Sequence, residues 1–352
     1  MPRPVSEGAM AAASDQGVHP RAQSGGDPLG GVVDVGTPRC PHCDATSGGA
    51  AHCSTCGRGL AICGGFVLGA ELDRGGVARI HAASAPGGFE AAVKLMERTP
   101  LHSLQVHQLF ARSARLLGGL AHPGLPRVLG FERTTCRSFL AMERLRGGTL
   151  WARVAPGQRL AGPAIDALLR GLLETAAFLH ARGLVHGDVT PRNVMFRAEG
   201  DPRPVLVDFD GLCTVDERDV ASLVMTRGYT APEQCAGRIG VASDLYGIGA
   251  TVVFAATGEC PDRLERRGAH ADLDLGGADV TPATRALLQR LVALDPNERP
   301  RSAQAALDAL SPRRRARAVG AKLLVAAALI VLFCMLAIGA LTFAGATGAR
   351  PL

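Results

Sequence analysis

Two groups of residues in this sequence have the types and spacing that chemistry requires. The first is the segment "HGDVTPRNVMF", residues 186–196, in which Asp188 and Asn193 lie five positions apart. Pro191 between them excludes a regular helix, so we expect a loop that presents a carboxylate, a carboxamide and the guanidinium of Arg192 together. An Asx-rich surface loop is the simpler interpretation. The choice between a site and a plain loop depends on what the rest of the chain supplies.

The second group consists of four cysteines arranged in two pairs. Cys40-x-x-Cys43 and Cys53-x-x-Cys56 are separated by nine residues, "DATSGGAAH", which form a flexible connection. Each pair presents two thiolates from one turn, and the spacing therefore predicts a tetrahedral Cys₄ site for Zn²⁺. Because four cysteines would fill all four positions, we expect a structural zinc rather than a catalytic one. Four unrelated thiols are the alternative interpretation.

Composition singles out one further residue. The chain has 352 residues, 47% of them apolar, and a net charge of +6, much of it in one run near the C-terminus, so nucleic acid is not an expected partner. Two lysines, Lys94 and Lys322, stand against thirty-six arginines. Where Arg has replaced Lys almost throughout, we expect Lys94 to do something that a guanidinium cannot. Ten cysteines without an N-terminal export signal indicate metal ligands or free thiols rather than disulfides.

The elements that must position these residues change character along the chain. We expect a disordered tail at 1–36 and a zinc ribbon at 37–60, followed by β-like runs "FVLGAEL", "VARIHAA" and "EAAVKLM". A helix is expected at about 103–117, strands near 126–131 and 138–142, and a long amphipathic helix within 163–183 that Gly183 stops. Further helices run to about 310. The pattern predicts an α+β arrangement, with a β-rich lobe followed by a larger helical lobe.

The C-terminal region has the composition of a membrane anchor. Residues 323–346 contain no charge over twenty-four positions, which as a helix would cross a bilayer core of about 30 Å. Five basic residues precede this run in or beside the predicted linker 311–322, and one, Arg350, follows it in the tail 347–352. The positive-inside rule then predicts a single-pass helix in the cytoplasmic (inner) membrane, with the N-terminal portion in the cytoplasm. A buried core helix is the alternative.

Further motifs follow one another in a fixed order around the opening segment. "AAVK", which ends in Lys94, lies ninety-four residues before Asp188, and "VLVDFDGL" places Asp208 twenty residues after it. "GYTAPEQ", "SDLYGIGATV" and "LDPNERP" come next. Together these motifs resemble the catalytic domain of eukaryotic-like protein kinases, in particular bacterial Ser/Thr kinases. The resemblance covers about residues 64–310 and implies a bilobal fold, with an N-lobe at 64–143 and a C-lobe at 148–310.

The resemblance implies transfer of the ATP γ-phosphate to protein Ser/Thr hydroxyls, with Mg²⁺ or Mn²⁺ as the divalent metal. Asp188 would accept the hydroxyl proton, Asn193 and Asp208 would hold the metal, and Lys94 would contact the α- and β-phosphates while Arg192 covers the γ-phosphate. The residues expected around the nucleotide are Leu72, Gly75, Ile80, Ala92, Lys94, Met142, Glu143, Leu145 and Met195. Three residues resemble structural anchors of the helical lobe: Glu233, Asp244 and Arg299.

Several positions depart from the family pattern. The glycine-rich loop reads "DRGGVA" at 73–78 and keeps the middle glycine, Gly75. Gly187 replaces the Arg that receives an activation-segment phosphate, so activity should not require that phosphate. Thr190 replaces the usual catalytic-loop Lys. Asp210 replaces the Gly that follows Asp-Phe, which should restrict flipping of that segment.

The largest departure lies in the helix that normally pairs a Glu with the Lys. Alignment to the family places Ser113 there, and no Asp or Glu occurs between Glu97 and Glu132. We therefore expect Lys94 to rest on Asp208 until Mg-ATP displaces it. A pseudokinase scaffold that binds nucleotide or partners with little or no transfer is the alternative function. Retention of the lysine and of all three loop residues favours an active kinase.

The expected cofactors are ATP, Mg²⁺ or Mn²⁺ and a structural Zn²⁺. The expected partners are protein substrates, the lipid bilayer through residues 323–346 and a protein bound by the zinc ribbon. Self-association and the choice between Ser/Thr and Tyr stay open.

Overall fold

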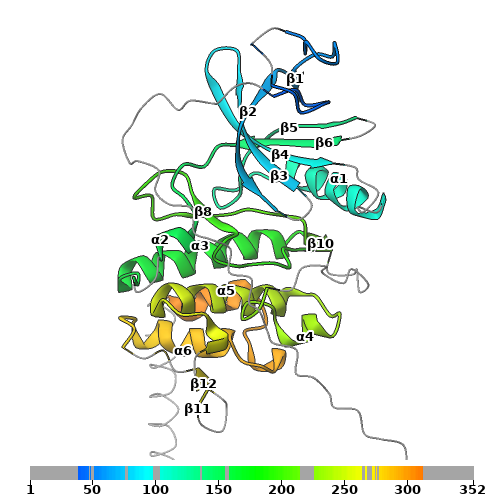
Figure 1. Cartoon of the computed structure of the whole chain (residues 1–352). Helices are drawn as coiled ribbons and strands as arrows, with labels where there is room; N and C mark the ends of the chain where they lie inside the picture. The colour runs from blue at the N-terminus through cyan, green and yellow to red at the C-terminus, as the bar shows by residue number, and fades with distance from the viewer. Residues whose placement is uncertain are drawn as a thin grey trace, which may run out of the picture. The chain divides into compact units, whose positions relative to one another are not determined.

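The computed structural model describes residues 39–311, apart from gaps at 47, 49–50, 76–77, 98–103, 135–136, 155–157, 215–225, 264–265, 268–271, 274 and 276. Its N-terminal part contains a six-stranded antiparallel sheet in the order β1-β2-β3-β4-β6-β5 (Figure 1). The strands are β1 (Ala61–Ile62), β2 (Phe66–Arg74), β3 (Ala78–Ala85), β4 (Phe89–Glu97), β5 (Val128–Arg133) and β6 (Arg137–Glu143). The expected strands are thus confirmed. Strand β1 was not predicted, because residues 61–62 lie between the predicted zinc ribbon and the predicted kinase domain.

Strand β4 shows how the sheet positions chemistry. Side chains alternate between the two faces of a strand, so Ala91, Val93 and Leu95 point to one face and are almost fully buried in the sheet's own apolar cluster. The intervening residues Lys94 and Met96 point to the opposite face. A strand of small and β-branched apolar residues therefore carries one lysine into a buried position.

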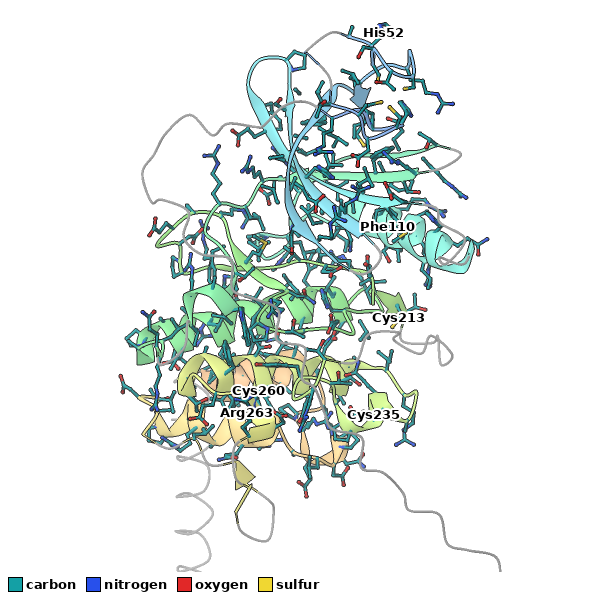
Figure 2. All side chains as sticks on the ribbon, in the orientation of Figure 1. His52, Phe110, Cys213, Cys235, Cys260 and Arg263 are labelled. Carbon is teal, nitrogen blue, oxygen red and sulfur yellow. The ribbon has the colours of Figure 1, made fainter. Side chains whose placement is uncertain are left out.

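Helix α1 (Leu104–Gly118) packs on the Met96 side of the sheet. Phe110 and Ala114 of this helix lie in one apolar cluster with Met96 and Leu140, and the Phe110 and Phe131 rings are 6.2 Å apart (Figure 2). Apolar side chains three and four positions apart form this stripe. The expected helix is confirmed, and its buried side combines apolar and small residues with His107, which is 2% exposed.

The second part of the chain is helical, as expected (Figure 1). Its helices are α2 (Leu150–Arg153), α3 (Gly162–His180), α4 (Pro232–Cys235), α5 (Val241–Thr257), α6 (Pro282–Leu291) and α7 (Ala303–Leu310), with 3₁₀ turns Pro261–Arg263 and Pro296–Glu298. Helix α5 is apolar on all sides and is buried from Ser243 to Thr257, because α3 and α6 pack around it. Helix α3 ends at His180, and Gly183 follows with a φ of +69°.

Short strand pairs between α3 and α4 flank the loops that contain Asp188, Asn193 and Asp208. Strand β7 (Leu184–Val185) pairs with β10 (Cys213–Thr214), and β8 (Val194–Phe196) pairs with β9 (Pro204–Leu206). A further pair, β11 (Arg266–Arg267) and β12 (Asp272–Leu273), lies before α6. The β7–β10 and β8–β9 pairs hold the loops 186–193 and 207–212 beside each other, although thirteen residues lie between them in sequence.

Three sequence expectations lie outside the described residues. These are the disordered tail at 1–36, most of the basic linker at 311–322, and the charge-free run at 323–346 with the tail that follows it. Among the helices that the structure does describe, none combines the length and apolar character needed to cross a bilayer.

Candidate active site and metal centre

The loop 186–193 brings the side chains of Asp188 and Asn193 together, and the hydroxyl of Thr226 reaches them from a later segment. Asn193 Nδ2 donates a hydrogen bond to the carboxylate Oδ2 of Asp188 at 2.8 Å and a second one to its backbone oxygen at 3.0 Å. Thr226 Oγ1 donates to the other carboxylate oxygen, Oδ1, at 3.2 Å. The carboxylate of Asp188 is therefore fixed on one side by an amide and faces an alcohol on the other. This Thr226 contact was not expected from the sequence.

The environment of Asp188 changes its affinity for a proton. Burial raises the pKa of Asp188 above its ordinary value, and the negative charge of Asp208 acts in the same direction. Hydrogen bonds from Thr226 and Asn193 act against this rise because they favour the ionised carboxylate. A carboxylate with a raised pKa accepts a proton from a hydroxyl more readily than an ordinary aspartate does.

A buried carboxylate on α5 anchors the start of this loop. Asp244 is 2% exposed and accepts hydrogen bonds from the backbone N–H groups of His186 at 2.9 Å and Gly187 at 2.8 Å. Its Oδ2 also lies 2.8 Å from His180 Nε2. Burial alone would raise the pKa of Asp244, but the hydrogen bonds and charge of its neighbours, His180 foremost, hold it below its usual range.

A second buried pair connects α4 to the end of the helical part. Arg299 Nη1 and Nη2 donate to the two carboxylate oxygens of Glu233 at 2.6 and 3.0 Å, and the arginine side chain is fully buried. The remaining guanidinium donors reach backbone oxygens, including those of Ala242 and Ala293. Ser243 Oγ also donates to Glu233. The sequence analysis expected structural roles for Glu233, Asp244 and Arg299, and all three occupy buried, extensively bonded positions.

Lys94 is held by two carboxylates of one segment. Its Nζ lies 2.7 Å from Asp208 Oδ1 and 2.7 Å from Asp210 Oδ2, and the lysine side chain is 9% exposed. Burial alone would lower the pKa of Lys94, but the charges of Asp208 and Asp210 raise it above its ordinary value. The contact with Asp208 was expected, whereas the contact with Asp210 was missed. The sequence signal for this contact was Asp210 itself. It is an acid two positions after Asp208, in a chain whose α1 helix contains no acid.

The segment that carries these two acids is fixed by packing. Phe209 is buried in a cluster with Leu117 of α1 and Leu212, and its ring meets His186 edge-on at 4.8 Å. The backbones of the two loops approach so closely that a Cβ at Gly187, whose φ is +81°, would lie 2.9 Å from the backbone oxygen of Gly211. No side chain fits at this contact, so a glycine is required at position 187 in this arrangement.

Four of the residues expected around the nucleotide are paired across the sheet. Ala92 pairs with Met142 across β4 and β6, and Ile80 pairs with Lys94 across β3 and β4, so these positions belong to neighbouring strands. Met142 is partly buried and packs against the apolar clusters of Phe209 and of Phe110.

The remaining nucleotide-site candidates lie at the edges of the sheet and at the start of the helical part. Leu72 is exposed, and Gly75 donates its N–H to the backbone oxygen of Ala78 at 2.9 Å, which closes the hairpin. The Glu143 carboxylate accepts a hydrogen bond from Arg197 at 2.9 Å. Leu145 and Met195 are partly buried, and Met195 lies on β8.

Arg192 lies on the solvent side of the catalytic loop. Its guanidinium is 4.6 Å from the centroid of the Trp151 ring, which in turn stacks on Phe254 at 5.1 Å. An arginine on an aromatic face gains cation–π attraction while its outward donors stay exposed. The structure thus places Arg192 on a stacked aromatic support four residues from Asp188.

Gln234 provides an uncharged connection that the sequence analysis missed. Its Nε2 donates to the backbone oxygen of Gly187 at 2.8 Å, and its Oε1 accepts from the N–H of Ala231 at 2.9 Å. A single carboxamide therefore joins the segment before α4 to the catalytic loop. This connection lies beside the position where the family carries an arginine.

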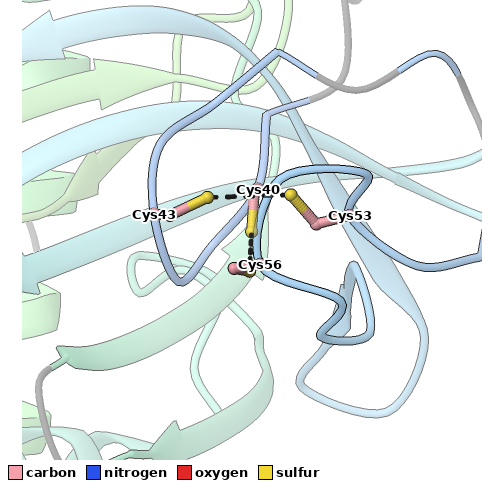
Figure 3. Close-up of side chains that lie close together, drawn as sticks. All are labelled: Cys40, Cys43, Cys53 and Cys56. Carbon is pink, nitrogen blue, oxygen red and sulfur yellow. Dashed lines mark hydrogen bonds between the residues drawn. The ribbon is translucent and has the colours of Figure 1, made fainter.

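The four cysteines of the N-terminal pairs converge (Figure 3). Their sulfur atoms all lie within 4.8 Å of one another, with Cys40–Cys56 and Cys43–Cys53 separations of 3.6 Å. The two turns have matching backbone bonds: the Cys40 carbonyl accepts from residue 44 and the Cys53 carbonyl from residue 57. Four sulfurs at this spacing are compatible with one tetrahedral metal, which fits the expected zinc site.

The cysteine turns are bonded to the sheet. Arg39 donates its N–H to the backbone oxygen of Leu68 on β2 at 3.0 Å, and Arg137 of β6 donates to the backbone oxygen of Pro41 at 2.7 Å. Arg79 of β3 forms an ion pair with Asp44 at 3.1 Å. The cysteine centre therefore contacts strands on which the nucleotide-site candidates lie.

Comparison with known proteins agrees with this geometry. The family model for the protein kinase domain matches residues 66–309. Serine/threonine-protein kinase C of Synechocystis is 32% identical over 212 residues, which cover 57% of this chain and 39% of that protein. Serine/threonine-protein kinase B of Synechocystis is 27% identical over 292 residues, covering 78% of this chain and 50% of that protein.

A third relative comes from another bacterium. Serine/threonine-protein kinase pkn2 of Myxococcus xanthus is 30% identical over 274 residues, covering 72% of this chain and 33% of that protein. The chain thus spans half or less of the length of these three relatives.

Proposed function

Because this chain belongs to the protein kinase family, we propose that it transfers the γ-phosphate of ATP to serine or threonine hydroxyls of protein substrates. The observation that carries the proposal is the assembly of Lys94, Asp188, Asn193 and Asp208 around one site, with an alcohol, Thr226, already donating to Asp188. Phosphoryl transfer depends on positioning and charge neutralisation more than on covalent chemistry. These residue types supply both.

In the proposed reaction, Asp188 Oδ1, which accepts from Thr226 in this structure, orients the substrate hydroxyl and accepts its proton. The raised pKa of Asp188 favours this role, and Asn193 keeps the carboxylate from rotating. Lys94 stabilises the negative charge of the α- and β-phosphates. Arg192, four residues from Asp188, is proposed to act on the γ-phosphate once it leaves the Trp151 ring.

Asn193 and Asp208 fit a magnesium site. Both present oxygen atoms, which Mg²⁺ and Mn²⁺ prefer, and the Asp208 side chain is 43% exposed and therefore accessible to a metal. Bound Mg²⁺ would neutralise phosphate charge during transfer. Asp208 must release Lys94 at least in part to serve as a ligand.

We propose that the nucleotide lies between the sheet and β8. Ile80, Ala92 and Met195 would contact the faces of the adenine, while Met142 would limit the depth of the pocket. The backbone of Glu143 and Leu145 would bond the adenine edge. Leu72 and Gly75 would cover the ribose and phosphates from the β2–β3 hairpin.

Two observations support the pseudokinase alternative. Helix α1 brings no acid to Lys94, and the catalytic loop carries Gly187 in place of an arginine. Both are compensated by contacts that the sequence did not predict: Asp210 pairs with Lys94, and Gln234 bonds the loop at Gly187. These compensations favour the active enzyme.

The test is Mg²⁺-dependent transfer of labelled phosphate from ATP by the purified full-length chain. Wild type should label itself or a generic protein substrate, and Asp188→Asn should reduce transfer by on the order of 10²-fold or more while ATP still binds. Glu199→Gln, an exposed acid between β8 and β9, is the matched control and should retain wild-type activity. Equal labelling by wild type and Asp188→Asn would leave the scaffold as the better account.

We propose that the Cys40, Cys43, Cys53 and Cys56 centre holds one structural Zn²⁺. The convergence of four sulfurs supports this assignment. Metal analysis should find one zinc per chain, and Cys53→Ser should release it. Cys235→Ser changes an exposed cysteine outside the centre and should keep the zinc. One zinc per chain in a Cys40/Cys53 double mutant would contradict the assignment.

We also propose that residues 323–346 anchor the chain in the cytoplasmic membrane, with the kinase domain in the cytoplasm. The charge-free run and the excess of basic residues before it support this proposal. The full-length chain should sediment with membranes, and truncation after Ala318 should release it. A truncated chain that stays with the membrane would contradict the anchor.

A further inference from the structure

Lys94 is attached to the loop 207–212 more firmly than the family pattern requires. Two carboxylates approach its Nζ, Asp208 and Asp210, each at 2.7 Å. The ammonium of Lys94 can neutralise one of these two carboxylates, which leaves one negative charge in excess beside it. Such an excess is suited to a site that later receives a divalent cation.

Helix α1 has no acidic residue along its whole length. Its buried residues include the apolar Phe110 and Ala114 together with Ser113 and His107, and none of these is an acid. Displacement of this helix therefore cannot carry a carboxylate toward or away from Lys94. The lysine must be aligned by another element.

Asp210 is fixed in place by the helical part. It directly follows Phe209, whose ring is buried against His186, and the N–H of Leu212 closes a turn onto the Phe209 backbone oxygen at 3.0 Å. The next residue, Gly211, lies against the backbone of the catalytic loop: a Cβ there would be 3.0 Å from the backbone oxygen of His186. The backbone at Asp210 therefore has little freedom.

The two acids would hold the lysine unequally during the reaction. Asp208 is the residue proposed to bind Mg²⁺, and a carboxylate oxygen that coordinates a metal is no longer available to Lys94. Asp210 has no such second task and stays at hydrogen-bond distance. The pairing at Asp210 is thus the one that can persist while nucleotide is bound.

We propose that Asp210 is the positioning residue for Lys94, performing from the loop 207–212 the task that a glutamate on the α1 helix performs in related kinases. The role of Asp210 in transfer rests on the proposed function, whereas its pairing with Lys94 does not. A consequence is that α1 need not supply a carboxylate for the alignment of Lys94.

The pairing can be tested without any transfer reaction, because the chain contains two lysines. In the full-length Lys322→Arg variant, Lys94 is the single lysine. Its modification by an N-hydroxysuccinimide ester, followed by peptide mass spectrometry in the absence of nucleotide, reports how strongly the amine is held. Asp210→Asn should raise the rate of modification several-fold, and the control Glu199→Gln should leave it unchanged. An unchanged rate in Asp210→Asn would overturn the proposal.

The catalytic consequence is tested by steady-state transfer. Asp210→Asn should lower kcat by about tenfold, corresponding to about 1.4 kcal/mol, with a smaller change in the KM for ATP. Adding Ser113→Glu to Asp210→Asn should restore part of the loss, because it supplies a carboxylate from α1. Full activity in Asp210→Asn would overturn the proposal even if the double variant fails to fold.

The two failures can be told apart. If wild type shows no transfer, the proposed function fails, and the modification rates of Lys94 still decide whether Asp210 holds it. If wild type transfers phosphate and Asp210→Asn matches it in both assays, the kinase assignment stands and Asp210 has no positioning role.

Discussion

Asp244 and Asp208 are both carboxylates beside the catalytic loop, but their surroundings are opposite. Asp244 is buried, and its oxygens accept bonds from the backbone N–H groups of His186 and Gly187 and contact the His180 ring. The Asp208 side chain is 43% exposed and pairs with a lysine that it must partly release to bind a metal. The first carboxylate is fully bonded within the protein, and the second keeps capacity for a ligand.

This difference extends to the regions around them. The anchor region, formed by Glu233, Asp244 and Arg299, keeps the residue types of the family and satisfies them with internal hydrogen bonds. The nucleotide side keeps Lys94 and Asp208 but carries Asp210 where the family has a glycine, and both acids pair with the lysine. A buried charge that loses its partner costs several kcal/mol, so the anchor tolerates little change. Exposed partners can be exchanged at lower cost.

The largest expected effect concerns the buried pair of the anchor region. Arg299→Ala should lower the free energy of unfolding by about 3–5 kcal/mol, because it leaves the carboxylate of Glu233 buried without its partner. Arg227→Ala is the matched control: Arg227 pairs with Asp262 but its side chain is 91% exposed, so the loss should stay below about 1 kcal/mol. Urea unfolding of both variants measures the difference, and equal losses would remove the distinction between anchored and exchangeable pairs.

An asparagine at each of the two carboxylates should separate stability from ligand binding. Asp244→Asn should destabilise the fold by about 1.5–3 kcal/mol, since an amide cannot replace a carboxylate that accepts several hydrogen bonds. Asp208→Asn should leave the unfolding free energy nearly unchanged but weaken Mg²⁺-dependent nucleotide binding, measured by calorimetry. If Asp208→Asn proved the more destabilising of the two, the comparison would be reversed.

A pair of glycine substitutions probes the contact between the two loops. Gly183 and Gly187 have similar positive φ values, +69° and +81°, so alanine at either costs about 1–2 kcal/mol in backbone strain. Gly187→Ala should cost more than Gly183→Ala, because its Cβ meets the Gly211 oxygen at 2.9 Å, whereas no atom lies within 4 Å at Gly183. Thermal unfolding gives both values. Equal losses would mean that the loops separate without cost.

The smallest expected effect is a shift in the pH dependence of transfer. Transfer requires ionised Asp188, so the rate falls as the pH drops through the folded pKa of Asp188, which burial places above that of an ordinary aspartate. Thr226→Val removes a hydrogen bond that favours the ionised form and should move this fall to a higher pH. Rates measured from neutral to acidic pH show the shift. Thr134→Val, in the β5–β6 turn, is the control and should leave the profile unchanged.

Two different contacts hold the loop 186–193 at Gly187: a side-chain hydrogen bond and a close approach of two backbones. The uncharged side chain of Gln234 donates a hydrogen bond to the backbone oxygen of Gly187, and the backbone of Gly187 lies close to that of Gly211. The catalytic loop is thus held at the position where an arginine is missing. The sequence analysis recorded the missing arginine as a departure, but the replacement lies forty-seven residues away and needed the fold to be found.

The sequence by itself determined the elements and their order. Alternating apolar residues located strands β2 to β4, the 3.6-residue stripe located α3, and the paired CxxC spacing located the cluster of four cysteines. These signals are local, because they depend on side chains a few positions apart. The motifs around Lys94, Asp188, Asn193 and Asp208 identified the family for the same reason.

The tertiary structure decided which groups complete the site. Asp210 was read as a restriction on loop movement, and its pairing with Lys94 became visible when β4 and the loop 207–212 were brought together across 116 positions. The bond between Thr226 and Asp188 also joins distant segments. A sequence shows that an acid is missing from α1, but which other acid reaches the lysine depends on distances of a few ångströms. Those distances are set by the packing of Phe209 and by the contact between two glycine backbones.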